Sequence, residues 1–270
     1  RREPKKRERG RAPRAGRAGS KLDLEAFLLG GPLANLLTAA VGLALLHGWP
    51  WSALSTAAIV GVVLSALLLG VVNLVPFRSK GWYSDGLNLL HLLRNDAAAR
   101  ARIQATQLLG LSLAGVRPRE WPDELMPAID GGNLDPLLES GFLAMHLIRA
   151  IDTHDRERSD MLAQRVVPLL HRGPDAMRTG LAVNIAFHIA VFHEDAALLA
   201  AWLPYCEGGL LDVSAQRELL HAEHRLLLGE DAAATVHLSQ ASANVHRVQD
   251  AGSAQMLEER IGLLRARLAN

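Results

Sequence analysis

The feature that most constrains this 270-residue chain is a stretch of 52 residues, Ala26 to Phe77, that contains no Lys, Arg, Asp or Glu. One span of a bilayer needs about 20 apolar residues. The stretch is therefore long enough for two spans, which we place at about residues 26–46 and 52–72. Between them the chain reads HGWPW, in which Gly and Pro favour a turn and the Trp residues are typical of a membrane interface. The sequence predicts a two-helix transmembrane hairpin.

Small residues within the two apolar segments indicate how the helices pack. Gly42 and Ala44 in the first segment, and Gly61 and Gly70 in the second, would permit close helix contact. The Gly30–Pro32 segment near the start of the first span is predicted to break that helix, which a membrane tolerates only where neighbouring protein or water satisfies the freed backbone groups.

Charge is distributed very unevenly along the chain. Residues 1–21 contain ten Lys or Arg and two acids, whereas the net charge of the whole chain is only +1. We predict that 1–21 is an irregular juxtamembrane arm that lies against anionic lipid headgroups. Nucleic-acid binding is the competing interpretation, but the adjoining apolar stretch makes lipid the simpler partner. Arg78 and Lys80 follow the second span, so both ends of the hairpin are predicted to be cytoplasmic.

The rest of the chain is predicted to be helical and soluble. We divide the chain that follows the arm into a membrane part, 22–90, and a domain of amphipathic helices, 91–270. The sequence EDAA at 194–197 recurs at 230–233, and an offset of 36 residues is close to that of stacked tetratricopeptide-like hairpins. The fold class is therefore all-α: a transmembrane hairpin followed by an α-solenoid-like domain, whose groove would suit a protein partner.

The single cysteine and the scattered histidines do not suggest a reactive site. Cys206 excludes an intrachain disulfide and fits a packed position in a reducing compartment. His221 and His224 share a helix face, but solvated histidines are commoner there than metal ligands. His188 and His193 follow an apolar helix, where a cation complements the helix dipole, and we interpret them as structural.

Two motifs accompany the predicted spans. The first span contains GPLAN at 31–35; the second ends in NLVP at 73–76 and is followed by Asp-Gly at 85–86. In this order, on consecutive apolar segments, the motifs resemble the C-terminal half of the catalytic core of site-2-protease-type membrane zinc metalloproteases. The resemblance covers about residues 30–90.

The resemblance implies roles for individual residues. Asp85 would be the third protein ligand to zinc, and Asn73 would hydrogen-bond the substrate backbone or the transition state beside the metal. Pro76 would break the helix so that the ligand loop turns back, and Gly86 matches the glycine that follows the ligand. A catalytic zinc with three protein ligands and one open position polarises the scissile carbonyl and activates water.

The first motif has an architectural role in the resemblance. Gly31, Pro32 and Asn35 match the positions that let the preceding span pack against the core.

The chain departs from the family pattern in two ways. The segment Phe77 to Ser84 lengthens the gap between the motifs, and Ser stands before Asp85. No His-Glu-x-x-His sequence, which would supply the other two ligands and the general base, is present. Because one carboxylate cannot hold zinc, we expect this chain alone to be inactive. It has no initiator Met, and we expect the missing half to lie upstream of Arg1.

Simpler interpretations of the same residues stay open. Asp85 could be only a helix N-cap, and Asn73 could only join helices through hydrogen bonds. Gly31-Pro32 could mark the start of a helix.

Two functions follow from these observations. The first is the C-terminal part of an intramembrane zinc metalloendopeptidase that cleaves membrane-associated proteins, located in a bacterial inner membrane with both termini cytoplasmic. The alternative is a membrane-anchored helical-repeat scaffold or inactive protease relative that binds protein partners. The expected partners are membrane protein substrates, the bilayer and a protein in the groove, with no nucleic acid.

Overall fold

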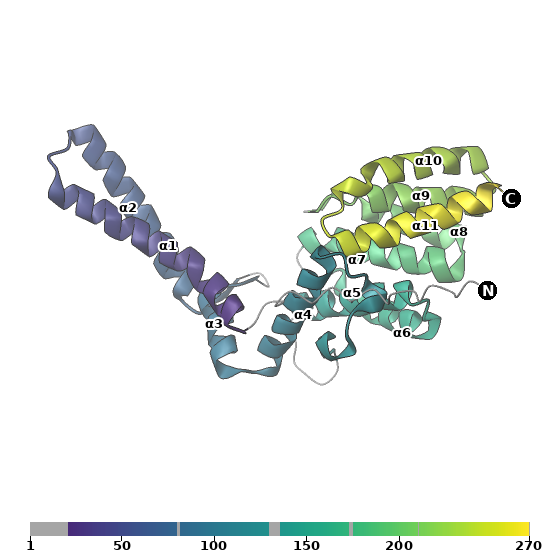
Figure 1. Ribbon diagram of the computed structural model, residues 1–270, viewed down its shortest axis with the longest axis horizontal. Coiled ribbons are helices and arrows are strands. Elements are labelled where there is room, and N and C mark those ends of the chain that lie inside the picture. The colour runs from purple at the N-terminus through teal and green to yellow at the C-terminus, as the bar shows by residue number, and fades with distance from the viewer. Residues whose placement is uncertain (1–20, 80–81, 130–135, 173–174, 210, 270) are drawn as a thin grey trace, which may run out of the picture.

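The protein consists of an apolar helical hairpin that projects from a larger helical body (Figure 1). The computed structural model describes residues 21–79, 82–129, 136–172, 175–209 and 211–269. Within these residues there are eleven α-helices and one short β-ribbon, so the all-α prediction is confirmed. Residues 1–20 of the predicted arm lie outside the described residues.

The hairpin is formed by α1 (Lys21–Gly48) and α2 (Ala53–Leu74), in agreement with the predicted pair of apolar segments. Ser52 caps α2, because its hydroxyl accepts a hydrogen bond from the amide of Ser55 at 3.2 Å. The Trp51 indole donates to the carbonyl of Leu45 at 2.9 Å and so closes the turn. Both helices are long and apolar enough to cross a membrane.

Small residues bring the two helices into close contact. A Cβ atom at Gly42 would lie 2.4 Å from the Val63 side chain. A Cβ atom at Gly70 would lie 3.2 Å from the carbonyl oxygen of Pro32 and 3.0 Å from the Leu36 side chain. Glycine at 42 and 70 therefore allows α1 and α2 to pack at short separation.

Four expectations about the hairpin were wrong. α1 continues through Pro32, so the Gly30–Pro32 segment neither breaks a helix nor starts one. A proline inside a helix removes one backbone hydrogen bond, which apolar helices tolerate where neighbouring protein groups satisfy the freed backbone. Ala44 is exposed, and a Cβ atom at Gly61 would meet nothing within 4 Å. Neither Ala44 nor Gly61 therefore contributes to the interface.

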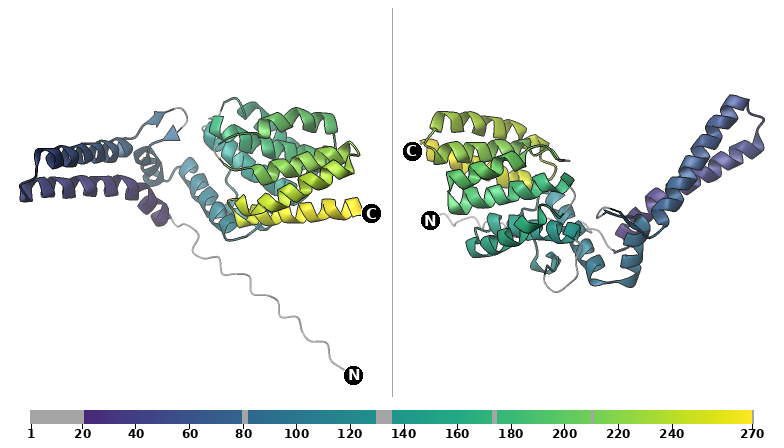
Figure 2. Two further views of the ribbon diagram at one scale, coloured as in Figure 1. Left: turned by 90° about the horizontal axis from the view of Figure 1, so that it is seen from above. Right: turned by 180° about the vertical axis from the view of Figure 1, so that it is seen from behind.

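A short connector joins the hairpin to the body. It contains the antiparallel strands β1 (Arg78–Ser79) and β2 (Trp82–Tyr83), followed by α3 (Asp85–Arg94) and α4 (Ala97–Leu113). Figure 2 shows the ribbon beside the base of the hairpin and α4 running from that base into the body. The β-ribbon thus lies beside the hairpin, whereas α4 leads into the body.

The body is a set of helices that pack with their neighbours in sequence, such as α5 with α6 and α9 with α10 (Figures 1 and 2). One core of leucine, alanine, isoleucine and valine side chains runs through α5–α11. The elements are η1 (Pro118–Glu120), η2 (Asp123–Leu125), α5 (Pro136–Asp152), α6 (Arg156–Val166), η3 (Val167–Leu169), α7 (Asp175–His188), the π-helical turn η4 (Ile189–His193), α8 (Ala196–Trp202), η5 (Leu203–Cys206), α9 (Ser214–Leu227), α10 (Asp231–Asn244), η6 (Val245–Arg247) and α11 (Ala251–Ala269).

Polar turns precede three of the helices in the body. His154 and Glu194 have positive φ angles of 57° and 48°, and each precedes an aspartate that caps the next helix. Glu230 occupies the N-cap position of α10 at the second copy of the EDAA sequence. Cys206 is fully buried, as predicted, and burial raises the pKa of its thiol to about 12. A thiol with this pKa is not a nucleophile at neutral pH.

The end of α4 is attached to the start of α11. Ser112 donates a hydrogen bond to the Asp250 carboxylate at 2.5 Å. A Cβ atom at Gly252 would lie only 2.4 Å from the carbonyl oxygen of Val116. Only glycine fits at position 252, so α11 lies directly against the segment that follows α4.

We expect Gly252→Ala to lower the stability of the body by about 1–3 kcal/mol, since overpacking against backbone forces α11 away from α4. Gly262→Ala is the matched control on the same helix, because a Cβ atom there meets nothing within 4 Å. It should raise stability by about 0.5–1 kcal/mol through helix propensity. Thermal unfolding of both variants followed by circular dichroism checks the pair. A Gly252→Ala protein that melts with the control would contradict the close contact.

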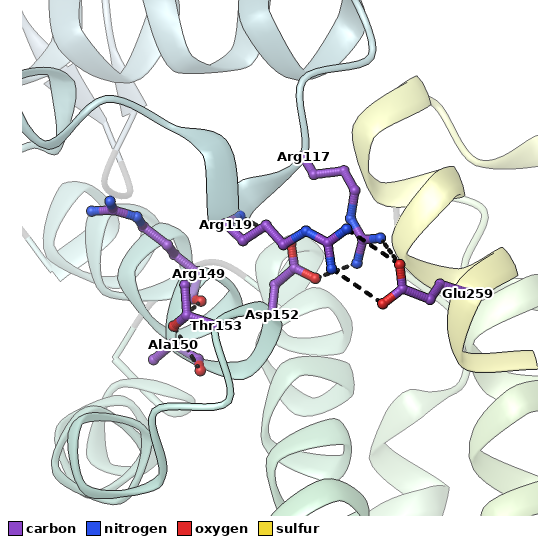
Figure 3. Close-up of polar contacts among 7 residues, drawn as sticks. All are labelled: Arg117, Arg119, Arg149, Ala150, Asp152, Thr153 and Glu259. Carbon is purple, nitrogen blue, oxygen red and sulfur yellow. Dashed lines mark hydrogen bonds and ion pairs between the residues drawn. The ribbon is translucent and has the colours of Figure 1, made fainter. Parts of the chain in front are cut away.

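A buried ionic cluster holds the same region together (Figure 3). Arg117 donates to the Asp152 carboxylate at 2.5 Å and to the Glu259 carboxylate of α11. Asp152 also accepts a hydrogen bond from the backbone amide of Arg119 at 2.9 Å. The side chains of Arg117 and Asp152 are 7% and 2% exposed, so the pair is shielded from water. The cluster ties α5, η1 and α11 to one another.

Candidate membrane-end site

The second apolar helix ends as the NLVP sequence predicts. α2 stops at Leu74, and Val75 follows in an extended conformation. Pro76 has no amide hydrogen to continue the helix, and the residue before a proline is sterically biased toward extended structure. The chain then reverses through β1 and β2. The helix thus ends just before Pro76, and the chain turns back after it.

Ser84 is the residue that organises this turn. Its hydroxyl donates to the carbonyl of Val75 at 2.7 Å and accepts from the amide of Phe77 at 3.1 Å. It also accepts from the amide of Leu87 at 3.2 Å, which makes Ser84 the N-cap of α3. Asp85 is the first residue of the helix, so the interpretation of Asp85 as the cap itself was wrong. The serine before Asp85 thus has a definite structural role.

Gly86 brings the two halves of the second motif together. A Cβ atom at this position would lie 1.9 Å from the carbonyl oxygen of Leu74. No other residue fits without moving α3 away from the end of α2. Because Leu74 follows Asn73 and Gly86 follows Asp85, the contact places Asn73 and Asp85 at the same end of the hairpin.

The side chains of Asn73 and Asp85 are half-buried. Among the residues that the structure describes, neither side chain has a hydrogen bond or ion pair. Asp85 also belongs to no group of three potential metal ligands in that part of the chain. As an acid in the first turn of α3, Asp85 lies at the positive end of that helix dipole. At this end of the hairpin, the described residues therefore provide one potential zinc ligand, Asp85, with Asn73 nearby.

The first motif lies on α1, at the interface with α2. Pro32 is fully buried, and its carbonyl faces Gly70 of α2. Asn35 is half-buried, whereas Gly31 is exposed and a Cβ atom there would meet nothing within 4 Å. Pro32 thus contributes to packing of the two apolar helices, whereas Gly31 makes no such contact.

A set of polar contacts among α3, α4 and the β-ribbon was not predicted from the sequence. The Arg102 guanidinium lies 4.5 Å from the centre of the Tyr83 ring and donates to the Asn88 side chain at 2.5 Å. His91 Nδ1 lies 2.5 Å from the carboxylate of Asp96, the N-cap of α4. These contacts hold α3 and α4 against the ribbon. They therefore fix the orientation of α3, which begins with Asp85.

The structure brings together a second set of residues that lie apart in the sequence. Asp160 of α6 lies beside His188 and His193, for which the sequence suggested only a structural role. The Nε2 atom of His193 is 2.9 Å from Asp160 Oδ1, and that of His188 is 3.3 Å from the same oxygen. Histidines five residues apart do not share a face of a regular α-helix, so the usual ligand spacing gave no signal.

The chain matches no protein-family model, no curated protein and no solved structure.

Proposed function

We propose that this chain is the C-terminal part of an intramembrane zinc metalloendopeptidase. The observation that carries the proposal is the contact of Gly86 with the Leu74 carbonyl, which sets Asn73 and Asp85 at one end of an apolar hairpin. An acid and an amide at the end of such a hairpin are functional candidates because they are costly in or near a membrane. Both side chains are available to a ligand in the part of the chain that the structure describes.

Asp85, Asn73 and Pro76 would each have a separate role in such a site. Asp85 would occupy one coordination position of a zinc ion, and two histidines from a His-Glu-x-x-His helix outside these 270 residues would occupy two more. When bound, the zinc ion supplies Lewis acidity and an activated water. Asn73 would orient the substrate backbone through its side-chain amide. The bend at Pro76 would let non-helical backbone line a polar cavity between apolar helices.

The surface of the hairpin supports a position in a bilayer. Leu33, Leu37, Leu64 and Leu68 are each more than half exposed, although they lie on long helices. Exposed apolar surface of this extent is unfavourable in water and favourable against lipid. The basic residues of the arm and Arg78 would lie on the cytoplasmic side of a bacterial inner membrane, with the Trp51 turn opposite.

Substitution of Asp85 tests the assignment. In the protein that includes the His-Glu-x-x-His region, Asp85→Ala should lower cleavage of a membrane protein substrate by at least about 100-fold, because a catalytic zinc needs all three ligands. Asp123→Ala is the control, since the Asp123 carboxylate is 88% exposed and far from the motifs in sequence. Cleavage is measured as product formed in reconstituted vesicles. Equal cleavage by the Asp85→Ala and control proteins would reject the proposal.

A second candidate function has an observation of its own. A cavity of about 240 Å³ lies among α5, α7, α9 and α11, with mostly apolar walls that include Ile148, Met177 and Met256. Gln216 also lines it, and its buried side-chain oxygen has no hydrogen-bond partner in the described structure. These features suit an apolar peptide segment with one donor. The helices of 91–270 would then form a solenoid-like scaffold, anchored by the hairpin, that binds a protein partner or positions the substrate.

A further inference from the structure

Three side chains in the helical body converge on one point, far along the chain from Asp85. Asp160 lies on α6, His188 is the last residue of α7, and His193 is the last residue of η4. The Nε2 atoms of the two histidines are 3.1 Å apart, and both lie within 3.3 Å of Asp160 Oδ1. Two nitrogens and one oxygen thus form a nearly equilateral triangle.

The π-helical turn is what makes this arrangement possible. In an α-helix, residues five apart point in directions that differ by about 140°, because each residue turns the chain by about 100°. A π-helix is wider and pairs residue i with residue i+5, so the two side chains come to lie on nearly the same face. The turn over Ile189–His193 therefore brings His193 back beside His188. Single π-turns of this kind occur frequently at functional sites.

The triangle has the dimensions of a metal-binding face. In a tetrahedral zinc site with bonds of about 2.0–2.1 Å, neighbouring ligand atoms are roughly 3.3 Å apart. The three observed separations, 2.9, 3.1 and 3.3 Å, are close to this value. An ion could bind all three atoms with small side-chain adjustments. Two imidazoles and one carboxylate also form a common ligand set for catalytic zinc and non-haem iron.

A neighbouring side chain orients the imidazole of His188 for metal binding. The hydroxyl of Ser159, which is fully buried, lies 2.7 Å from His188 Nδ1. A proton on Nδ1 donated to this hydroxyl leaves the lone pair of Nε2 directed at the triangle, which is the usual support for a metal-bound histidine. The His193 side chain, at 33% exposed, leaves the outer side open to solvent.

We propose that Asp160, His188 and His193 form a binding site for one divalent transition-metal ion of the zinc class, with an open position toward solvent. The ion would link α6 to the end of α7 through coordinate bonds. The site is separate from the zinc proposed at Asp85 and needs no residue outside this chain. It gives the helical body a metal dependence of its own.

The test uses the full 270-residue chain in detergent micelles, carrying no polyhistidine tag. We expect one Zn²⁺ ion per chain after equilibrium dialysis, measured by mass spectrometry of the metal. Loss of a residue that only supports a ligand lowers metal affinity about 10–100-fold, so loss of a ligand should lower it at least about 100-fold. His193→Ala, at the surface, and Asp160→Asn, which keeps its size, should both show this loss. Circular dichroism verifies that each variant is folded.

Two controls make the result specific. His237→Ala removes a histidine that pairs with Glu218 at 2.8 Å and lies outside the triangle. Asp85→Ala removes the ligand proposed for the membrane-end site. Both should bind zinc as the unchanged chain does. Equal affinity of the His193→Ala, Asp160→Asn and unchanged chains, or no bound zinc in the unchanged chain, would overturn the proposal and leave a hydrogen-bonded cluster.

A thermal measurement provides an independent readout. Zinc at about 100 times its dissociation constant should raise the midpoint of unfolding by roughly 5–10 °C, since it binds only the folded chain. The same zinc concentration should leave the midpoint of His193→Ala unchanged. An equal rise in both proteins would mean that zinc acts elsewhere.

Discussion

Replacing Asp152 by alanine is expected to destabilise the helical body by about 3–5 kcal/mol, because it leaves the Arg117 guanidinium buried without its most shielded partner. The same change removes the acceptor of the Arg119 amide, so a second polar group loses its hydrogen bond. For a chain of this length, the midpoint of thermal unfolding should fall by roughly 6–20 °C. The cluster in Figure 3 joins α5, η1 and α11, so the loss should affect all three elements.

Arg119→Ala is the matched control for this cluster. Its guanidinium contacts Glu259 at 3.2 Å but is 39% exposed, and exposed ion pairs contribute less than about 1 kcal/mol. Its backbone amide, which bonds to Asp152, is unchanged by the substitution. Circular dichroism during heating of both variants in detergent compares them directly. If Asp152→Ala unfolds no earlier than Arg119→Ala, burial of the pair is not what stabilises this junction.

Gly86→Ala is expected to separate α3 from the end of α2. Overpacking in a core typically costs about 1–3 kcal/mol and occasionally more. Here the obstacle is a backbone carbonyl at 1.9 Å, which cannot turn aside without unwinding α2, so we expect a cost of at least about 3 kcal/mol. The connector should then become more sensitive to trypsin, which cleaves after Arg78 and Arg94. The proposed protease function further predicts that, beside a His-Glu-x-x-His helix, the Gly86→Ala variant cleaves substrate more slowly although Asn73 and Asp85 are both retained.

The control for this prediction is Gly61→Ala on α2. A Cβ atom at Gly61 meets nothing within 4 Å, so the substitution should not destabilise the hairpin. The rates of trypsin cleavage of the two variants, measured in the same micelles, provide the comparison. A Gly86→Ala protein as resistant as Gly61→Ala would show that α3 does not rest on the end of α2.

Features that depend on a few adjacent residues were predictable from the sequence. The hairpin, the end of α2 before Pro76 and the helix starts after Asp155 and Asp195 follow from apolar length, from proline geometry and from capping side chains. The burial of Cys206 follows from its apolar surroundings. Each of these depends on local energetics that a stretch of sequence contains in full.

Features that depend on contacts between distant segments were not predictable. Pro32 was expected to break α1. Instead α1 is continuous, and the Pro32 carbonyl packs against α2 at Gly70. Gly42 and Gly61 look equivalent in the sequence, and only Gly42 faces the other helix. Spacing alone does not tell which side of a helix meets its neighbour, because that depends on how the whole helix is rotated.

The sequence by itself determined that the chain is all-α and that its first part is an apolar hairpin, and the resemblance of its motifs selected Asn73 and Asp85 for testing. These conclusions follow from composition, helix-ending residues and motif order. Only the tertiary structure decided that Gly86 rests on the Leu74 carbonyl and that a π-turn brings His193 to His188 and Asp160. The reason is that both depend on how backbones far apart in sequence approach each other, which local preferences do not specify.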